Sequence, residues 1–260
     1  MNPSTAFATV LVDELVRCGL REAVLAPGSR SAPLAMALHA RSLARPGAGG
    51  PPGLRLHVRI DERSASFLAL GLAKASGRPA AVVCTSGTAA AHLHAAVIEA
   101  DEAGVPLLVL TADRPPELRG TGANQTIDQI KLYGSAVRWF CEAGVPEDRP
   151  GQAGYWRSLA GRAWSQAAGS AGGYPGPVHL NLPLRDPLVP DLPGTAGLAG
   201  AAAALDPDEP SRWSEPPGGR PAGRPWTWVA APAEPGLPEL ELDWTERGLV
   251  LAGDGTADPG

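Results

Sequence analysis

The sequence predicts an α/β fold with a doubly wound, mostly parallel sheet. Short apolar runs of strand length alternate with longer segments in which apolar residues recur at helical spacing. The runs 80–84, 107–110 and 178–182 are almost wholly apolar, as is typical of strands that helices cover on both faces. Repeated strand-then-helix units of this kind favour a parallel sheet between two helical layers.

The elements can be placed in chain order. A helix begins at Asn2-Pro3-Ser4 and ends at Gly19, and Pro33 fits the first turn of a second helix. Further helices are expected from Ser64, after the turn at 85–88, and near 152–168. The expected strands cover 22–26, 54–60, 80–84, 107–110 and 178–182.

Three regions are predicted. Residues 1–188 form the α/β domain, and residues 189–246 read as a linker dense in Pro, Gly and Ala. Its tryptophans are expected to pack on a domain surface. Residues 247–260 resemble the first strand of a central domain that is cut short, because a lone strand does not bury its own faces.

Composition and charge indicate which partners and which cellular setting to expect. The net charge is −5 without a basic run, so nucleic acid is not an expected partner. No apolar stretch reaches about 18 residues, so no membrane span is expected. The N-terminus lacks the pattern of a signal peptide. Three widely spaced cysteines fit neither a disulfide framework nor a zinc site, which favours a reducing, cytoplasmic setting.

Glu62 is the leading candidate for catalysis. Apolar residues at every second position from 54 to 60 predict a short buried strand, and helical spacing begins at Ser64. Asp61 and Glu62 therefore lie at the carboxyl end of a parallel strand, where open α/β sheets bind ligands. An apolar setting favours the protonated form of such a carboxyl, which suits a group that shares a proton with a ligand nitrogen.

Two further turns carry polar groups at strand ends. Gly28, Ser29 and Arg30 combine backbone donors with a guanidinium that can grip a carboxylate. Ser86 lies in a similar turn after the expected strand at 80–84, although its hydroxyl also suits helix capping. An ordinary capped turn with a solvated Arg30 remains an alternative for the first turn.

A third turn and a loop add Arg114, Asn124 and Gln125. Pro115 and Pro116 stiffen the turn after Arg114, which suits anion binding, although a surface pair between Asp113 and Arg114 would also fit. The two amides suit a polar substrate or an ordinary bend. The five histidines show no metal-ligand spacing and are taken as structural.

Together these segments resemble the family of 2-succinyl-5-enolpyruvyl-6-hydroxy-3-cyclohexene-1-carboxylate synthases, the MenD family of thiamine diphosphate-dependent enzymes in menaquinone biosynthesis. The resemblance covers about residues 4–188 and resumes at 248–253. It rests on the order and spacing of Ala26–Leu34, Asp61–Arg63, Leu70–Lys74, Thr85–Ala89, Leu110–Leu118 and Gly122–Gln125.

The resemblance implies a pyrimidine-binding domain. It assigns Glu62 to the N1′ atom of the cofactor's aminopyrimidine, and places Gly28 and Ser86 at the cofactor. It implies transfer of a succinyl unit from 2-oxoglutarate to isochorismate by a homo-oligomer. We expect Ser29 and Arg30 to bind one substrate carboxylate, with Arg114, Asn124 and Gln125 nearby.

The resemblance also implies that Mg²⁺ and the diphosphate bind a C-terminal domain beyond these residues. The chain holds no metal site of its own on this view, and is expected to be inactive alone.

Three alternatives remain. An acetolactate synthase-type enzyme would share the glutamate and the sheet but not the Ser29-Arg30 turn or the 113–117 run. A non-catalytic assembly subunit would need a separate chain with the Mg²⁺ site. A nucleotide-binding dehydrogenase is less consistent, because no Gly-x-Gly-x-x-Gly follows the first strand.

Overall fold

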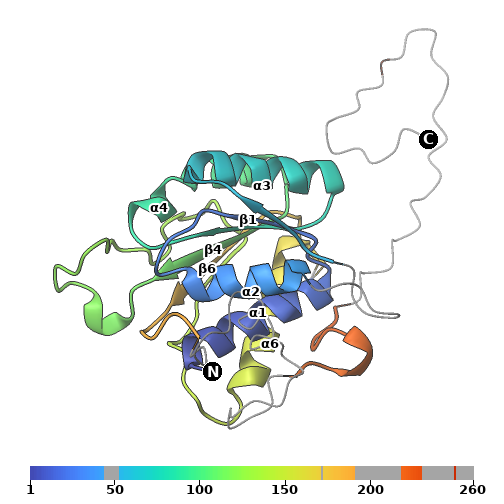
Figure 1. Cartoon of the computed structure of the whole chain (residues 1–260). Coiled ribbons are helices and arrows are strands. Elements are labelled where there is room, and N and C mark those ends of the chain that lie inside the picture. The colour runs from blue at the N-terminus through green and yellow to red at the C-terminus, as the bar shows by residue number, and fades with distance from the viewer. Residues whose placement is uncertain (44–52, 171, 191–217, 230–248, 250–260) are drawn as a thin grey trace.

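Six parallel strands form one sheet in the order β2-β1-β3-β4-β6-β5 (Figure 1). The computed structural model describes residues 1–43, 53–170, 172–190, 218–229 and 249. The strands are β1 Glu22–Leu25, β2 Arg55–Val58, β3 Ala80–Cys84, β4 Leu107–Asp113, β5 Trp139–Glu142 and β6 Pro177–Pro183. The predicted α/β class with a doubly wound parallel sheet is confirmed.

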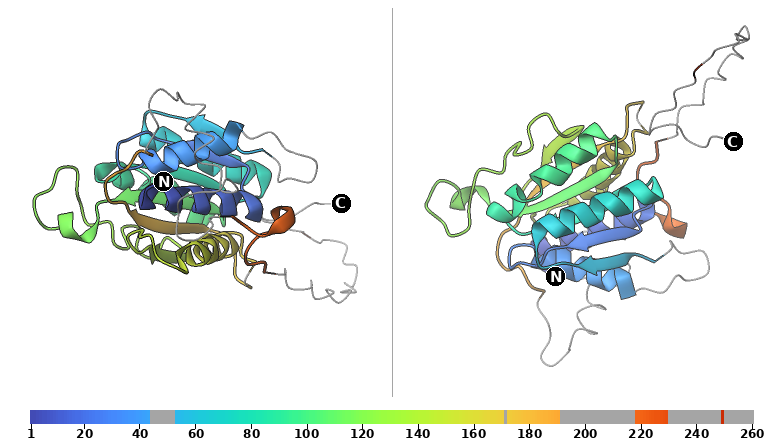
Figure 2. Two further views of the ribbon diagram at one scale, coloured as in Figure 1. Left: turned by 60° about the horizontal axis from the view of Figure 1, so that its bottom comes forward. Right: turned by 90° about the horizontal axis from the view of Figure 1, so that it is seen from above.

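Helices cover both faces of the sheet. Figures 1 and 2 show α1, α2 and α6 on one face and α3 with α4 on the other. Each face has its own apolar cluster, which explains why the central strands are apolar along their whole length. The helices are α1 Pro3–Cys18, α2 Ala32–Leu43, α3 Glu62–Ser76, α4 Thr88–Ala91, α5 His94–Glu102 and α6 Gln152–Ala167, with short 3₁₀ turns η1 Pro116–Leu118 and η2 Pro221–Gly223.

The first helix has the ends that its sequence predicts. The Asn2 side chain accepts a hydrogen bond from the Thr5 amide at 2.9 Å, and Pro3 occupies the first turn. Gly19 ends the helix at φ 128°, a conformation that disfavours side chains, and its amide donates to the carbonyls of Leu15 and Val16.

The prediction of a buried strand before Glu62 is wrong. β2 is an edge strand that pairs only with β1, and within it Leu56 is half-buried while Val58 is 49% exposed. Ile60, beyond the strand end, is 81% exposed. Alternating apolar residues do not reveal whether a strand lies at the centre or at the edge of a sheet, because position in the sheet depends on long-range pairing.

The secondary structure differs from the sequence prediction at two places. β5 was not predicted, and it is a short, half-buried edge strand beside β6. The single Ala-rich helix expected after residue 88 is divided into α4 and α5 around Leu93.

A buried ionic cluster joins α1 to α6. The Arg157 Nη1 atom lies 2.9 Å from Asp13 Oδ2 and 2.6 Å from Glu14 Oε2, and all three side chains are almost completely buried. Arg17 adds a second cation at 2.6 Å from Asp13. Two carboxylates are thus buried next to guanidinium groups. Buried charges of one sign are tolerated only when charges of the opposite sign pair with them.

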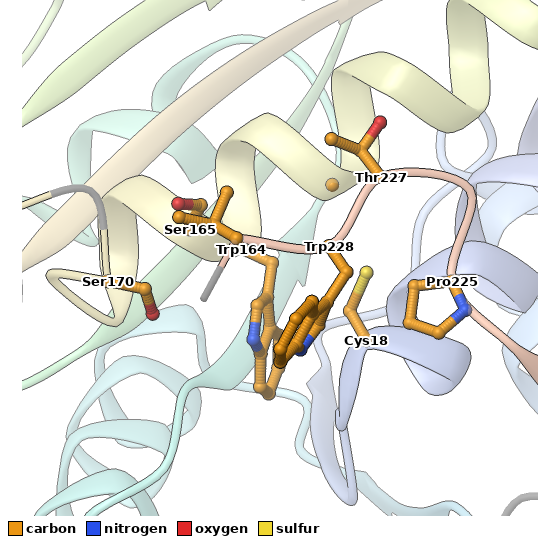
Figure 3. A pocket seen from close by; sticks show the side chains of 9 residues that line it. Cys18, Trp164, Ser165, Ser170, Pro225, Thr227 and Trp228 are labelled. Atoms are coloured by element: carbon orange, nitrogen blue, oxygen red, sulfur yellow. The ribbon is translucent and has the colours of Figure 1, made fainter. Parts of the chain in front are cut away.

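Residues 218–229 lie against the α1 and α6 face (Figure 2). The backbone amide of Trp226 donates to Glu14, and Arg17 donates to the Arg220 carbonyl at 2.9 Å. A small pocket lies between this segment and the two helices, lined in part by Cys18, Trp164 and Trp228 (Figure 3). Burial, with Glu14 nearby, raises the pKa of Cys18 to about 12, so its thiol is protonated.

The domain boundaries at 188 and 246 stay predictions. Most of the predicted linker, Trp213 and Trp244 included, lies outside the described residues, as does the predicted strand near 248–253 apart from Leu249. Within 218–229, Trp226 is only partly covered and Trp228 is 77% exposed. The expectation that linker tryptophans pack on the domain therefore holds for Trp226 in part and fails for Trp228.

Replacing Arg157 with leucine should destabilise the domain by about 3–5 kcal/mol, because Asp13 and Glu14 would remain buried with insufficient positive charge. The free energy of unfolding from urea titration measures this change. Arg149→Ala is the matched control, since Arg149 pairs with Glu147 at an exposed position and should contribute less than about 1 kcal/mol. Equal losses in the two variants would contradict the interpretation.

Candidate active site

The candidate site lies where the strand order reverses. After β1 the chain passes to β2 on one side and then to β3 on the other, so the carboxyl ends of β1 and β3 form a topological switch point. Open α/β sheets bind ligands in the crevice at this position. The turn with Gly28 follows β1, and the turn with Ser86 follows β3.

The β1 and β3 turns are in direct contact. A Cβ atom added to Gly28 would lie 2.4 Å from Thr85 Cβ, so only glycine allows this approach. Thr85 Oγ1 is buried and has no hydrogen-bond partner within the described part of the chain. A hydroxyl without a partner at a sheet's binding edge is available to a ligand.

Ser86 connects the β3 turn with two other sequence-predicted residues. Its hydroxyl lies in hydrogen-bond contact with Arg114 Nη1 and donates to the Gln125 carbonyl at 3.2 Å. Gln125 returns a hydrogen bond from Nε2 to the Ser86 carbonyl at 2.9 Å. The structure therefore brings Ser86, Arg114 and Gln125 together, and Gln125 already uses one of its two amide donors within the protein.

Arg30 faces a carboxylate of the chain itself. Its Nη1 atom donates to the Leu184 carbonyl and to Asp186 Oδ2, both at 2.9 Å. Arg30 Nε is buried without a hydrogen-bond partner among the described residues. The alternative of a solvated Arg30 is therefore wrong.

Arg30 and Arg114 together make a positive site in a chain of negative net charge. Partial burial of Arg114, followed by the charge of Arg30, lowers the pKa of Arg114 below its ordinary value. Two guanidinium groups within electrostatic reach of each other favour an anion between or beside them. Asp186, whose side chain is largely exposed, already supplies one carboxylate to Arg30, so a substrate carboxylate would replace it or bind beside it.

Glu62 is the first residue of α3 and is half-buried at the same edge of the sheet. The Asp61 side chain caps this helix by accepting a hydrogen bond from the Ser64 amide at 2.9 Å. Burial raises the pKa of Cys84, at the end of β3, and the charge of Glu62 adds to that rise. Glu62 therefore lies within electrostatic reach of the β3 turn.

Two predicted residues contribute less to this arrangement. Ser29 and Asn124 are exposed, on the β1 turn and on the loop after β4. Their predicted contacts with substrate stay predictions, as do the individual roles of Gly28, Arg30, Glu62, Ser86, Arg114 and Gln125.

A buried polar network beneath the site was not predicted. Asp113 is fully buried and accepts from Asn181 Nδ2 at 2.8 Å and from the Arg114 backbone amide at 2.7 Å, so the alternative of a surface pair with Arg114 is wrong. Its cationic partner is Arg119, at 2.8 Å. Gln129 also belongs to this network and had no sequence signal, because one amide in a loop is indistinguishable from ordinary turn chemistry.

His179 ends the same network. Thr111 donates its only hydroxyl proton to Asn181 Oδ1, so the His179 Nε2 atom, 2.7 Å from Thr111 Oγ1, is the donor of that contact. Burial lowers the pKa of His179 to about 3. The imidazole is therefore neutral in the folded protein near neutral pH.

Two kinds of feature are absent from the described residues. No group of three or more His, Cys, Asp or Glu side chains there could hold a metal ion. No helix in the described part of the chain is long and apolar enough to cross a membrane.

Comparison with known proteins gives a consistent result. Residues 5–132 match the family described as thiamine pyrophosphate enzyme, N-terminal TPP binding domain. Three similar proteins all carry the name 2-succinyl-5-enolpyruvyl-6-hydroxy-3-cyclohexene-1-carboxylate synthase. The relative from Thermobifida fusca is 58% identical, covering 100% of this chain and 41% of the relative.

The relative from Saccharopolyspora erythraea is 57% identical and that from Rhodococcus jostii 49% identical, each covering 99% of this chain and 42% of the relative. The chain thus spans about two-fifths of the length of the relatives that it matches.

The stability of the domain should fall as the pH is lowered from 7 to 5. Folding lowers the pKa of His179 from 6.5 to about 3. At pH values between these two, the unfolded chain binds a proton at this histidine and the folded chain does not. His179 should contribute a loss on the order of 1 kcal/mol per pH unit, as measured by urea unfolding. His179→Gln should reduce this slope and the exposed control His92→Gln should not. Equal slopes in parent and His179→Gln would contradict the assignment.

Proposed function

Because the chain belongs to the thiamine pyrophosphate enzymes, and within them to the 2-succinyl-5-enolpyruvyl-6-hydroxy-3-cyclohexene-1-carboxylate synthases, we propose that it supplies the pyrimidine-binding part of such a transferase. The proposed reaction decarboxylates 2-oxoglutarate and adds the succinyl unit to isochorismate in menaquinone biosynthesis. The observation that carries this proposal is the convergence of Arg30, Arg114 and Ser86 at the switch point of the sheet. The proposed location of the enzyme is the cytoplasm.

The residues present fit the pyrimidine end of thiamine diphosphate. Gly28 closely approaches Thr85, whose buried hydroxyl has no partner among the described residues, and Glu62 supplies a carboxyl at the same edge. The chain spans only about two-fifths of the length of the relatives that it matches. We therefore propose that the diphosphate and Mg²⁺ are held by a part of the enzyme outside this chain.

When bound, thiamine diphosphate supplies the carbanion chemistry that amino-acid side chains lack. The part proposed for Glu62 is to hold a proton shared with the N1′ atom of the aminopyrimidine. Gly28 and Ser86 would hold the cofactor through the adjoining turns. These assignments use the polar groups at the carboxyl ends of β1, β2 and β3.

Both proposed substrates are anions. We propose that individual arginine side chains at the site bind their carboxylates. Arg30, with an unused Nε donor, would bind one substrate carboxylate together with Ser29. Arg114 would bind nearby, oriented by Ser86. Asn124 and Gln125 would hydrogen-bond the substrate from the loop after β4.

We further propose that a second subunit or domain covers the edge at β2. Ile60 and Val58 flank Glu62 on its N-terminal side and Phe67, 47% exposed, lies one turn into α3. A group of exposed apolar side chains of this kind is a common sign of a protein interface. Such a cover would remove water from Glu62, which is only half-buried in the single chain, and fits a homo-oligomeric enzyme.

Glu62→Gln in a full-length synthase that carries this sequence should lower kcat for 2-oxoglutarate decarboxylation by about 10²–10⁴-fold, because the amide cannot carry the shared proton. Carbon dioxide release measures the rate, and thiamine diphosphate affinity should change far less. A loss smaller than about threefold would exclude the proton-transfer role.

The same assay tests the substrate class. The parent enzyme should use 2-oxoglutarate with isochorismate as acceptor and should be poor with pyruvate. Preferential use of pyruvate would instead support an acetolactate synthase-type activity. Glu99→Gln on α5 is a matched control, since this exposed glutamate is remote from the turns and its variant should keep the parent rate.

Ile60→Asp should weaken subunit association of the full-length synthase, because it places a charge in the proposed apolar interface. Sedimentation velocity across a concentration series measures the association. Tyr174→Asp is the control, since Tyr174 is also exposed but lies before β6, away from the β2 edge. If both variants associate like the parent, the β2 edge is not the interface.

A further inference from the structure

We propose that Gln129 and Asn181 are positioning residues for this reaction, two buried carboxamides that hold the Ser86 turn in place relative to Arg114. The inference rests on the proposed function, since it assigns these residues to the orientation of the proposed site. Neither side chain reaches the site itself. Both act through the polar network beneath it.

The backbone pairing between β3 and β4 ends before the turns that carry Ser86 and Arg114. The β3–β4 pairing ends at Cys84 and Thr111, whereas β4 continues beside β6 to Asp113 and Pro183. The turn that follows Cys84 therefore has no ladder hydrogen bonds to the last two residues of β4. Its position relative to Arg114 depends on other contacts.

Gln129 supplies a bridge at this gap. Its Oε1 atom accepts the Gly87 amide at 2.8 Å, while Nε2 donates to the Ala112 carbonyl at 3.2 Å. One carboxamide thus joins the β3 turn to β4 where backbone pairing has ended. Because the side chain is fully buried, water offers no ready substitute for these contacts.

Gly87 is a sensitive point for such a bridge. It has φ 84°, and a Cβ atom added there would lie 2.9 Å from Gln125 Cγ. Ser86, its neighbour, contacts both Arg114 and Gln125. Displacement of the Gly87 amide would therefore move three residues that the proposed function uses.

Asn181 fixes the orientation of Gln129 and joins it to Arg114. Its Oδ1 atom accepts from Gln129 Nε2 at 2.9 Å and its Nδ2 atom donates to Asp113 Oδ2 at 2.8 Å. Because the Asp113 carboxylate only accepts, the Asn181 amide has one orientation that satisfies both contacts. Asp113 in turn accepts the Arg114 backbone amide.

These contacts form a continuous path from the Gly87 amide to the Arg114 amide through two carboxamides and one carboxylate. Each partner has a donor where its neighbour has an acceptor, so a change of one amide to an acid breaks the sequence of donors and acceptors. A path of this kind acts on geometry, and small misplacements of binding groups lower rates by as much as about 10²-fold.

The first test measures the bridge without reference to activity. Gln129→Leu in the 260-residue chain should reduce hydrogen-exchange protection of the Gly87 amide about tenfold, because that amide loses its acceptor. Gln129→Glu keeps an acceptor and should retain more of this protection. The matched control is Thr9→Val, which removes a buried hydrogen bond in α1 and should leave Gly87 unchanged.

The second test measures catalysis in the full-length synthase. Both Gln129 variants and Asn181→Leu should lower kcat/KM for 2-oxoglutarate by about 10–100-fold, with little change in thiamine diphosphate affinity. Gln129→Glu should regain activity relative to the parent as the pH falls, since only its protonated carboxyl can again donate to Asn181 or Ala112. The same pH dependence in a variant that stays folded throughout this pH range distinguishes positioning from a purely structural role.

The outcomes are separable. If Gln129→Leu does not fold, the kcat/KM of Gln129→Glu and its pH dependence still test the inference. The inference is overturned if Gly87 protection in Gln129→Leu and kcat/KM in both Gln129 variants stay within about threefold of Thr9→Val. If the parent synthase lacks activity with 2-oxoglutarate and isochorismate, the proposed function fails, whereas an effect of Gln129 on Gly87 protection would still establish the bridge.

Discussion

The candidate site depends on the register in which β1, β3, β4 and β6 pair. Parallel pairing places the carboxyl ends of all four strands at one edge, and each strand is followed there by a turn with polar groups. The close approach of Gly28 to Thr85 then allows the first two turns to touch. A shift of one residue in any pairing would turn inward-facing side chains outward and separate Arg30, Ser86 and Arg114.

The buried carboxylates of this protein find their partners in two different ways. Between α1 and α6, Asp13 and Glu14 are balanced directly by Arg157 and Arg17, which links helices that are far apart in sequence. Beneath the site, the single carboxylate of Asp113 is shared among Asn181, Arg119 and the Arg114 amide. The first arrangement supports the fold, whereas the second lies where it can also set the geometry of the proposed active site.

The β2 edge carries three exposed apolar side chains close in sequence to Glu62. Most apolar residues lie in the two clusters on either side of the sheet, but Val58, Ile60 and Phe67 remain exposed beside Glu62. A carboxyl that shares a proton with a ligand benefits from removal of water. The exposed apolar edge and the half-buried Glu62 are thus consistent with the proposed cover of this edge by a second subunit or domain.

The sequence by itself determined the local elements and the candidate residues. The ends of α1, the central strands and the turns with Gly28, Ser86 and Arg114 follow from periodicity, capping and turn chemistry, which act over a few residues. The family followed from the joint order of those turns. None of these inferences required knowledge of which strands are neighbours.

The tertiary structure alone decided which residues meet. It placed β2 at an edge, gave Arg30 the partner Asp186, buried Asp113, and brought Gln129 and Asn181 together across 52 positions of sequence. These results depend on long-range pairing and on which polar groups lose contact with water. A single sequence carries only a weak signal for either, because a buried amide and an exposed amide have the same local pattern.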